Sequence, residues 1–247
     1  MRIFQTILLI LFIFFFGSCA YFALRSLDRA GDSTKSLNLN RQGLQTLPFE
    51  LFYLENLEEL RLYRNELTEV PPEINRLKNL KKLYLGKNKL TTLPEEIGEL
   101  TALEVLSVPF NDLDSFPKSI KNLVNLEHLI LDHNNLKRLP DELGLLPKLK
   151  TITVSYNQLE TIQPALFDSA SLEILNISFN LVDSIPEAIG KAVNLHELHL
   201  DNAGFMLTLP ESLCNLRRMD LIVLDQSVQL PRCILVRRPP QLKIIYR

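Results

Sequence analysis

Leucines alternate with polar residues in short segments that recur along the middle of the chain. Leu60 and Leu62, for example, are separated by Arg61 and followed by Tyr63. This alternation has the two-residue period of a β-strand with one buried face and one solvent-facing face. The same pattern predicts further strands with the inward pairs Leu83/Leu85, Leu106/Val108, Leu129/Leu131, Ile152/Val154, Leu175/Ile177, Leu198/Leu200 and Leu221/Val223.

An amide-bearing residue follows the predicted strands at a fixed interval of 23 residues. A fixed period in this range is typical of a solenoid, in which each coil buries its apolar face against the next. An asparagine side chain both donates and accepts hydrogen bonds, so at an inward turn it satisfies backbone groups that would otherwise be stranded in the core. We call this column the ladder, and it reads Gln42, Asn65, Asn88, Asn111, Asn134, Asn157, Asn180, Ala203 and Gln226.

A proline-containing segment completes each repeat, as residues 93–100 illustrate. Pro94 lies where the chain must bend, and apolar residues three apart follow at Ile97 and Leu100. This arrangement predicts a short helical or extended turn on the outer surface.

The eighth repeat departs from this regularity. Ala203 replaces the amide, and residues 205–210 carry one residue more than their counterparts. We interpret a residue as lost again between Leu216 and Leu221, which restores the period at Gln226. Two explanations stay open: drift near the end of the stack, where terminal repeats are usually atypical, and a local bulge that shapes a contact surface.

The repeated frame resembles the 23-residue class of leucine-rich repeat proteins, whose consensus is LxxLxLxxNxLxxLPxxIxxL; residues 57–77 follow it closely. The resemblance implies an α/β solenoid, a right-handed coil with a curved parallel β-sheet on its concave face and short helical or extended turns on its convex face. The concave face of such proteins binds other proteins or peptides, and no catalysis is implied. We predict a repeat domain over residues 36–226 in about nine coils, followed by a C-terminal cap over residues 227–247.

The first residues have a different character. Arg2 precedes an apolar run at residues 7–16, which is the form of an export signal. The sequence Phe-Gly-Ser-Cys at residues 16–19 resembles the bacterial lipobox, which implies lipidation of Cys19, although Phe16 stands where that motif prefers leucine. An uncleaved signal anchor and a plain cleaved signal stay open, because apolar character continues weakly toward the roughly 20 residues that a membrane span requires.

Residues 1–19 are thus expected to be a signal peptide or membrane anchor, and residues 20–35 a tether or N-terminal cap. All three alternatives place the repeats outside the cytoplasm, and we predict a membrane-anchored, extracytoplasmic protein in the bacterial outer membrane or periplasm. An anchor in the reverse orientation would instead keep the repeats inside the cell, since Arg2 stands on one flank and Arg25 and Arg29 on the other.

Two cysteines remain if Cys19 carries a lipid. Cys214 and Cys233 are about one coil apart, so they are expected on neighbouring outer turns. In an oxidising compartment they would form a disulfide that staples the C-terminal end, worth on the order of 3 kcal/mol. Two buried free thiols are the alternative.

The outward residues beside the predicted strands form the surface to which the resemblance assigns ligand binding. In the column directly before the ladder, four rings follow one another at a strand spacing of about 4.8 Å. Exposed aromatic rows beside charges are typical of peptide sites, and the alternative is that the rings only pack on one another. The residues that we predict to contact a ligand are Arg61, Tyr63, Arg64, Tyr84, Phe110, His133, Tyr156, Phe179 and His199.

Charge along this face changes sign from one end to the other. The first coils present Arg41, Arg61, Arg64, Lys82 and Lys87, and the last present Glu197, Asp201, Asp220 and Asp225. We therefore expect a polar groove in which arginines fix an acidic end of the partner.

Composition and motifs narrow the function further. Lys plus Arg is 27 and Asp plus Glu is 29, which gives a formal charge of -2 and no basic excess for nucleic acid. Phosphate-binding and hydrolase motifs are absent from the sequence. The histidines of coils five and eight lie three strands apart, on the order of 14 Å, so they would not share a metal ion.

The sequence therefore predicts a membrane-anchored, extracytoplasmic protein- or peptide-binding module, not an enzyme, without cofactors or metal and monomeric. Two alternatives stay open. One is a structural or adhesion scaffold of the cell envelope, and the other is an intracellular scaffold if the N-terminal segment is an anchor with the repeats inside.

Overall fold

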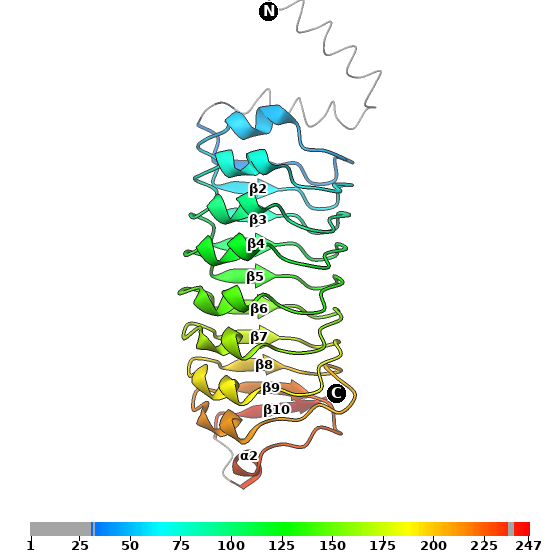
Figure 1. Cartoon of the computed structure of the whole chain (residues 1–247), viewed down its shortest axis with the longest axis vertical. Helices are drawn as coiled ribbons and strands as arrows, with labels where there is room; N and C mark the ends of the chain where they lie inside the picture. The colour runs from blue at the N-terminus through cyan, green and yellow to red at the C-terminus, as the bar shows by residue number, and fades with distance from the viewer. Residues whose placement is uncertain (1–30, 32, 237–239) are drawn as a thin grey trace, which may run out of the picture.

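The computed structural model describes residues 31, 33–236 and 240–247, so the predictions for residues 1–19, including lipidation of Cys19, lie outside the described residues. The described strands form one parallel sheet in which spatial order equals sequence order (Figure 1). They are β1 (Ser36–Asn38), β2 (Glu59–Arg61), β3 (Lys82–Tyr84), β4 (Val105–Ser107), β5 (His128–Ile130), β6 (Thr151–Thr153), β7 (Ile174–Asn176), β8 (Glu197–His199), β9 (Leu221–Leu224) and β10 (Lys243–Tyr246).

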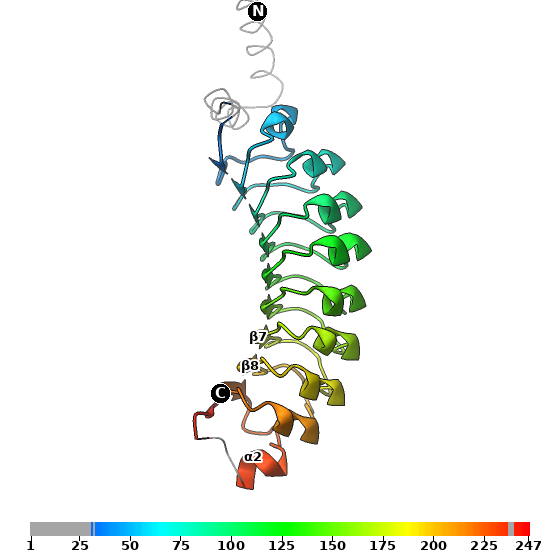
Figure 2. The same cartoon turned by 90° about the vertical axis from the view of Figure 1, so that its left-hand side faces the viewer.

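Short helices cover the opposite side of each coil, on the convex face of the curved stack (Figure 2). Most of the 3₁₀ helices directly follow a proline in an extended conformation, as Pro94 does before η3, because the ring fixes φ and ends the preceding segment. The helices are η1 (Phe49–Tyr53), η2 (Pro72–Arg76), η3 (Glu95–Glu99), η4 (Lys118–Asn122), η5 (Asp141–Leu145), η6 (Pro164–Asp168), η7 (Glu187–Lys191), η8 (Glu211–Asn215) and α2 (Arg232–Val236).

The leucines of the frame form one continuous core between the sheet and the helices. Leu60 pairs with Leu83 and Leu83 with Leu106, so neighbouring strands are in register at a spacing of 23 residues. These residues are completely buried, together with their counterparts in the later coils. The predicted α/β solenoid with its curved parallel sheet is therefore confirmed.

Asparagines of the ladder bridge successive coils through backbone groups. The Asn134 amide nitrogen donates to Val108 O at 3.0 Å in the preceding coil and to Leu131 O at 2.9 Å in its own. Its oxygen accepts from Leu113 N at 3.0 Å. The ladder asparagine thus satisfies three buried backbone groups, which is the role that its donor and acceptor atoms predict.

A second column of amides, on the side where the chain returns to the sheet, was not predicted. Asn79 donates to Glu55 O at 2.9 Å, and Asn125 donates to Thr101 O at 2.8 Å. Asn194 repeats the contact at 2.7 Å to Ala170 O. These side chains also tie each coil to the one before it.

The predicted register of the ninth coil is wrong. Leu198 pairs with Ile222, an offset of 24 residues, so the extra residue of coil eight is not compensated before β9. Ile222 and Leu224 are completely buried, whereas Leu221, predicted to point inward, is partly exposed. Gln226 is exposed and does not continue the ladder.

Backbone atoms replace the missing amide at Ala203. Val182 N, which corresponds to the nitrogen that a ladder oxygen binds in other coils, donates to the Ala203 carbonyl at 2.6 Å. Gly204 makes this close approach feasible, because a Cβ on it would lie 1.8 Å from Val182 O. At Ala203, a backbone carbonyl therefore replaces the ladder amide, and the extra residue of coil eight makes this local rearrangement possible.

Residues 227–247, predicted as a cap, continue the sheet. β10 pairs in parallel with β9, and Arg247 Nη1 lies 3.2 Å from Asp201 Oδ2 of coil eight. None of the helices in the described part of the chain is long and apolar enough to cross a membrane.

Candidate ligand-binding face

The column directly before the ladder has an unusual backbone conformation. Each strand ends three residues earlier, as β4 ends at Ser107 before Phe110, and the column itself is left-handed with φ between 51° and 59°. This conformation is uncommon for residues other than glycine. It turns each side chain outward, although the adjacent ladder residues from Asn65 to Ala203 are buried. We call this column the turn row; it comprises Arg41, Arg64, Lys87, Phe110, His133, Tyr156, Phe179 and Asn202.

Four rings of the turn row form a continuous face-to-face stack. Centroids of Phe110 and His133 are 4.1 Å apart, those of His133 and Tyr156 are 4.2 Å apart, and those of Tyr156 and Phe179 are 4.1 Å apart. The rings are parallel within 13°. They therefore pack on one another, yet Phe110 is 44% and Tyr156 45% exposed. Ring packing and a solvent-facing aromatic surface coexist.

The stack continues at one end into positive charge. Lys87 Nζ lies 5.1 Å from the centroid of Phe110 and 5.8 Å from that of Tyr63, which is a cation–π geometry. Arg41 and Arg64 follow in the same row, are exposed, and have no ion-pair partner among the described residues. This end of the row thus offers cations that internal contacts do not neutralise.

The predicted acidic end is largely occupied by contacts within the protein. Asp201 is 1% exposed, accepts from Ser178 Oγ at 2.6 Å and pairs with Arg247. Asp225 accepts from Asn202 N at 2.8 Å. His199 pairs with Glu197 at 3.5 Å rather than joining the aromatic stack. The carboxylates of Asp201 and Asp225 are therefore engaged within the protein, whereas Asp220 is exposed.

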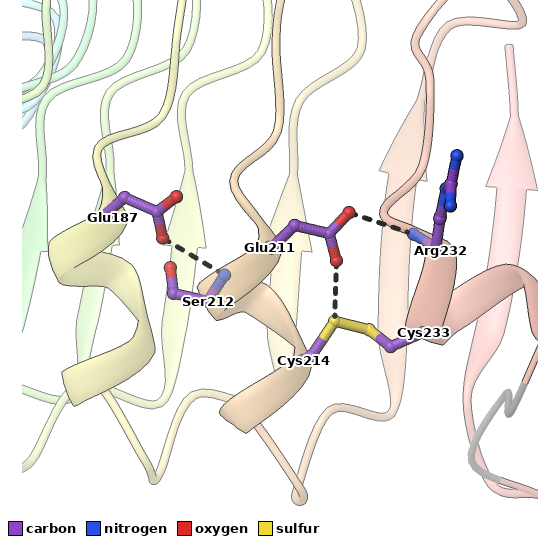
Figure 3. Close-up of a disulfide and its surroundings, with 6 residues drawn as sticks. All are labelled: Glu187, Glu211, Ser212, Cys214, Arg232 and Cys233. Atoms are coloured by element: carbon purple, nitrogen blue, oxygen red, sulfur yellow. Dashed lines mark hydrogen bonds between the residues drawn. A yellow bond between two sulfur atoms is a disulfide. The ribbon is translucent and has the colours of Figure 1, made fainter.

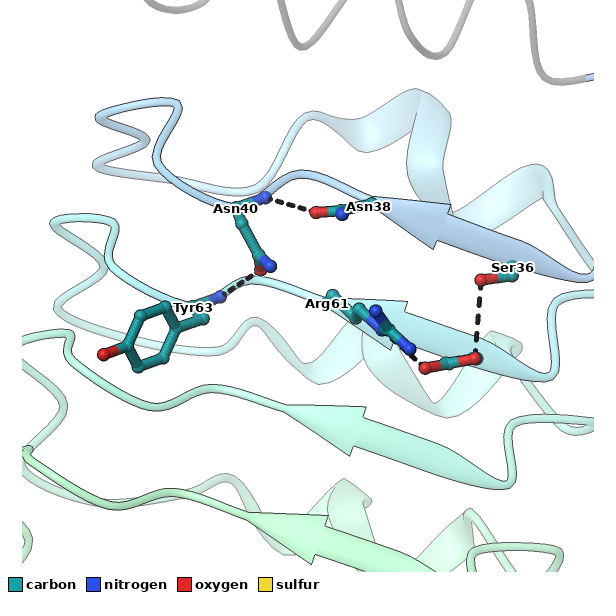
Figure 4. A network of polar contacts seen from close by, with 6 residues as sticks. Ser36, Asn38, Asn40, Arg61 and Tyr63 are labelled. Carbon is teal, nitrogen blue, oxygen red and sulfur yellow. Dashed lines mark hydrogen bonds and ion pairs between the residues drawn. The ribbon is translucent and has the colours of Figure 1, made fainter.

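A hollow of about 420 Å³ lies on the strand face of the first coils. Predicted residues Arg61, Tyr63 and Tyr84 line it. Arg61 Nε bonds Glu59 Oε1 at 2.6 Å, and its guanidinium lies 5.8 Å from the Tyr84 centroid. Figure 4 shows Arg61 and Tyr63 on one coil beside Asn40 of the coil before, whose Oδ1 accepts from Tyr63 N at 2.7 Å. The complete lining is Asn40, Arg61, Tyr63, Tyr84, Gly86, Ser107 and Pro109.

Gly86 and Pro109 are site residues that the sequence interpretation missed. A Cβ on Gly86 would lie 3.1 Å from Pro109 Cγ and 3.2 Å from Tyr63 Cδ2, so the two rings flank a notch over the glycine. The sequence could have indicated this notch, because position 86 is a glycine in a column of outward-facing residues.

The structure joins Cys214 and Cys233, with their Cα atoms 6.0 Å apart (Figure 3). The bond ties η8 to α2 on the convex side, away from the strand face. Glu211 Oε2 lies 3.8 Å from Cys214 Sγ. With both sulfurs bonded to each other, this group of three residues offers no thiolate ligand to a metal ion.

Sequence comparison supports the same architecture. A family described as "Leucine Rich repeats (2 copies)" matches residues 55–96 and 124–166, and "Leucine rich repeat" matches residues 147–204. The chain is built from leucine-rich repeats. No curated protein matches it by sequence.

Solved leucine-rich repeat structures superpose on most of the chain. A leucine-rich repeat protein of Leptospira interrogans shares 32% identity with a TM-score of 0.64, covering 87% of this chain and 61% of that one. An internalin of Listeria monocytogenes shares 20% identity with a TM-score of 0.74, covering 87% and 61%, and shows the fold alone. The plant peptide hormone receptor RGFR1, solved with RGF2, shares 25% identity with a TM-score of 0.55, covering 87% and 44%. The chain thus spans about three fifths of the first two proteins.

Proposed function

We propose that the strand face and turn row bind an extended segment of another protein, and that an N-terminal anchor holds this module outside the cytoplasm. One observation carries the binding proposal: the turn row aligns three cations with four stacked rings on successive coils. Acidic residues of a partner would face the cations, and its apolar residues would cover the exposed ring edges. The peptide hormone receptor with the same fold supports a peptide as the partner.

The left-handed turn explains why this row suits binding. It holds the row in a backbone conformation that the stack of coils fixes, so the side chains are positioned before a partner arrives. A surface ordered in advance loses little conformational entropy on binding. Its aromatic part is also the kind of surface that dominates binding energy at interfaces.

A displayed library of random peptides tests the binding proposal. The wild-type protein should enrich peptides that carry acidic and apolar residues, and Phe110→Ala/Tyr156→Ala should bind the enriched peptides at least about 30-fold more weakly. Tyr53→Ala removes an exposed ring from the convex side and is the matched control. The double substitution should lower the melting temperature by only a few degrees.

Two outcomes would count against binding by this row. One is enrichment that survives the double substitution unchanged. The other is unfolding of the Phe110→Ala/Tyr156→Ala protein, which would assign the stack to stability.

Anchoring requires a separate test. A bacterial host fed an alkyne-tagged palmitate should label the full-length protein, and Cys19→Ala should lose the label while Cys214→Ala/Cys233→Ala keeps it. Label retained in Cys19→Ala, or none in the wild type, would reject lipidation at this residue.

A further inference from the structure

Rings stand on both sides of a glycine in the hollow of the first coils, and the exposed cations Arg41 and Arg64 belong to the turn row beside it. Tyr63 and Pro109 flank Gly86, and Tyr84 forms a third wall. We infer that the hollow accepts one proline of a polyproline II segment that carries a carboxylate three residues from that proline. The inference rests on the proposed function, because it names the class of peptide bound there.

Shape favours a proline over the notch. Directly above Gly86 the space is too tight even for a methyl group, which would lie 3.1–3.2 Å from ring atoms of Tyr63 and Pro109, so a ligand ring lies on top of these two rings rather than between them. A flat, compact pyrrolidine ring can rest on this floor against apolar ring faces, as prolines do in aromatic-lined grooves. A long or branched side chain would lose more rotamer freedom on entering.

Hydrogen bonding favours the same segment. A polyproline II segment forms no internal hydrogen bonds, and its prolines lack an N–H, so its carbonyls need donors from the partner. Tyr63 and Tyr84 line the hollow, and neither hydroxyl has a hydrogen-bond partner among the described residues. Phenol O–H groups are suitable donors for these carbonyls.

Spacing distinguishes polyproline II from a β-strand. Coils are about 4.8 Å apart, so Gly86 and the equivalent residue two coils earlier, Asn40, are separated by about 9.6 Å. One turn of polyproline II contains three residues and advances about 9.3 Å. A β-strand advances about 6.8 Å between residues on the same side, which matches neither one coil nor two.

Charge then selects the residue one turn away. The position next to Asn40 is Arg41, which is exposed and has no ion-pair partner in the described ranges. Arg64 lies in the same row one coil nearer to Gly86, and it also has no ion-pair partner among the described residues. A carboxylate three residues from the buried proline would meet this charge, whereas an ammonium group would be repelled.

A short synthetic peptide tests the inference. Pro-Pro-Pro-Glu-Pro-Pro-Pro has a proline three residues from the glutamate on both sides, so it fits in either chain direction. We expect saturable binding of the fluorescently labelled peptide at about 1 mM or below. The peptides Ala-Ala-Ala-Glu-Ala-Ala-Ala and Pro-Pro-Pro-Lys-Pro-Pro-Pro should each bind at least about tenfold more weakly.

Two variants locate the bound peptide. Gly86→Ala fills the notch and should weaken binding at least about tenfold with an unchanged circular dichroism spectrum. Arg41→Glu changes an exposed residue and should reverse the preference, so that the lysine peptide binds better than the glutamate peptide. If Gly86→Ala does not fold, the Arg41→Glu preference decides alone.

The test separates this inference from the proposed function. Tyr53→Ala, which removes an exposed ring from the convex side, should keep the affinity for the proline peptide. Absence of saturable binding, equal affinity for the glutamate and lysine peptides, or an unchanged preference in Arg41→Glu would overturn the inference. Library peptides that depend on Phe110 and Tyr156 would still support the proposed function in that case.

Discussion

In coils two to seven, the side-chain amides of Asn65 to Asn180 hold the inward turn after each strand. In coil eight the Ala203 carbonyl accepts the hydrogen bond from Val182 N that an asparagine oxygen would otherwise accept. The regular coils need no covalent link, because identical hydrogen bonds recur along the stack. The C-terminal coils replace this regularity with a disulfide, a bridge from Arg247 to Asp201 and the short helix α2. The comparison teaches that a solenoid tolerates a broken repeat when other contacts satisfy the same backbone groups.

The largest effect is expected from the ladder itself. Asn134→Ala removes three hydrogen bonds and leaves Leu113 N buried without a partner, while Val108 O and Leu131 O keep the amides of Asn111 and Asn157. Together these losses should lower the free energy of unfolding by about 4 kcal/mol. Urea denaturation measures the loss. Ala203→Asn is the counterpart in coil eight and should bring no gain, since Val182 N is already bonded. If Ala203→Asn instead raised the free energy of unfolding by as much as Asn134→Ala lowers it, the two regions would not differ as we describe.

The disulfide should be next in size and confined to the C-terminal coils. Cys214→Ser/Cys233→Ser removes a link across 19 residues and should cost about 3 kcal/mol. Hydrogen exchange should accelerate in β9 and β10 and stay unchanged in β4. A reductant should reproduce the effect in the wild type and do nothing to the variant; uniform acceleration along the stack would contradict a local role.

Loss of the bridge between β10 and coil eight should have a smaller effect. Arg247→Ala leaves the Asp201 carboxylate, which is 1% exposed, with Ser178 Oγ as its partner. Because the arginine side chain is 64% exposed, the expected loss is only about 1–2 kcal/mol. Adding Asp201→Asn should restore part of it in thermal denaturation. A double variant less stable than Arg247→Ala would exclude an unpaired charge as the cause.

A pH effect at the opposite end of the stack should be the smallest. Hydrogen bonds from Lys35 and Lys81 lower the pKa of Glu58 to about 2 from its ordinary 4.5. A depressed carboxyl pKa stabilises the fold above pH 4.5, and this contribution is lost as the pH falls from 4.5 toward 2. The melting temperature of Glu58→Gln should therefore be slightly below wild type at pH 7 and converge with it near pH 2. Glu50→Gln, without an ion pair in the described structure, should show no such convergence.

The register of coil nine could not be predicted from the hydrophobic pattern. The run Leu221, Ile222, Val223 and Leu224 is apolar throughout, so it fits either alternation of inward and outward residues. A residue inserted in coil eight can be compensated or carried forward without changing that pattern. Pairing with β8 selected Ile222 and Leu224 as the inward residues.

The candidate site was predicted in part for a similar reason. The aromatic members of the turn row were found because their spacing follows the ladder. Their left-handed backbone was not predicted, since that conformation is usually associated with glycine, and Phe110 or Tyr156 gives no local sign of it. The notch at Gly86 depends on rings from the coils on either side, which a single repeat does not contain.

Sequence alone determined the solenoid, its 23-residue period, the core leucines and the ladder from Asn65 to Asn180, because each depends on contacts that repeat identically between neighbouring coils. Only the tertiary structure decided the register of β9, the bond from Val182 N to Ala203, the use of Asp201 by Arg247 and the hollow over Gly86. Each of these depends on how one particular coil meets its neighbours. The periodic sequence pattern predicts the contacts that all coils share, whereas tertiary packing determines the contacts that are specific to one coil.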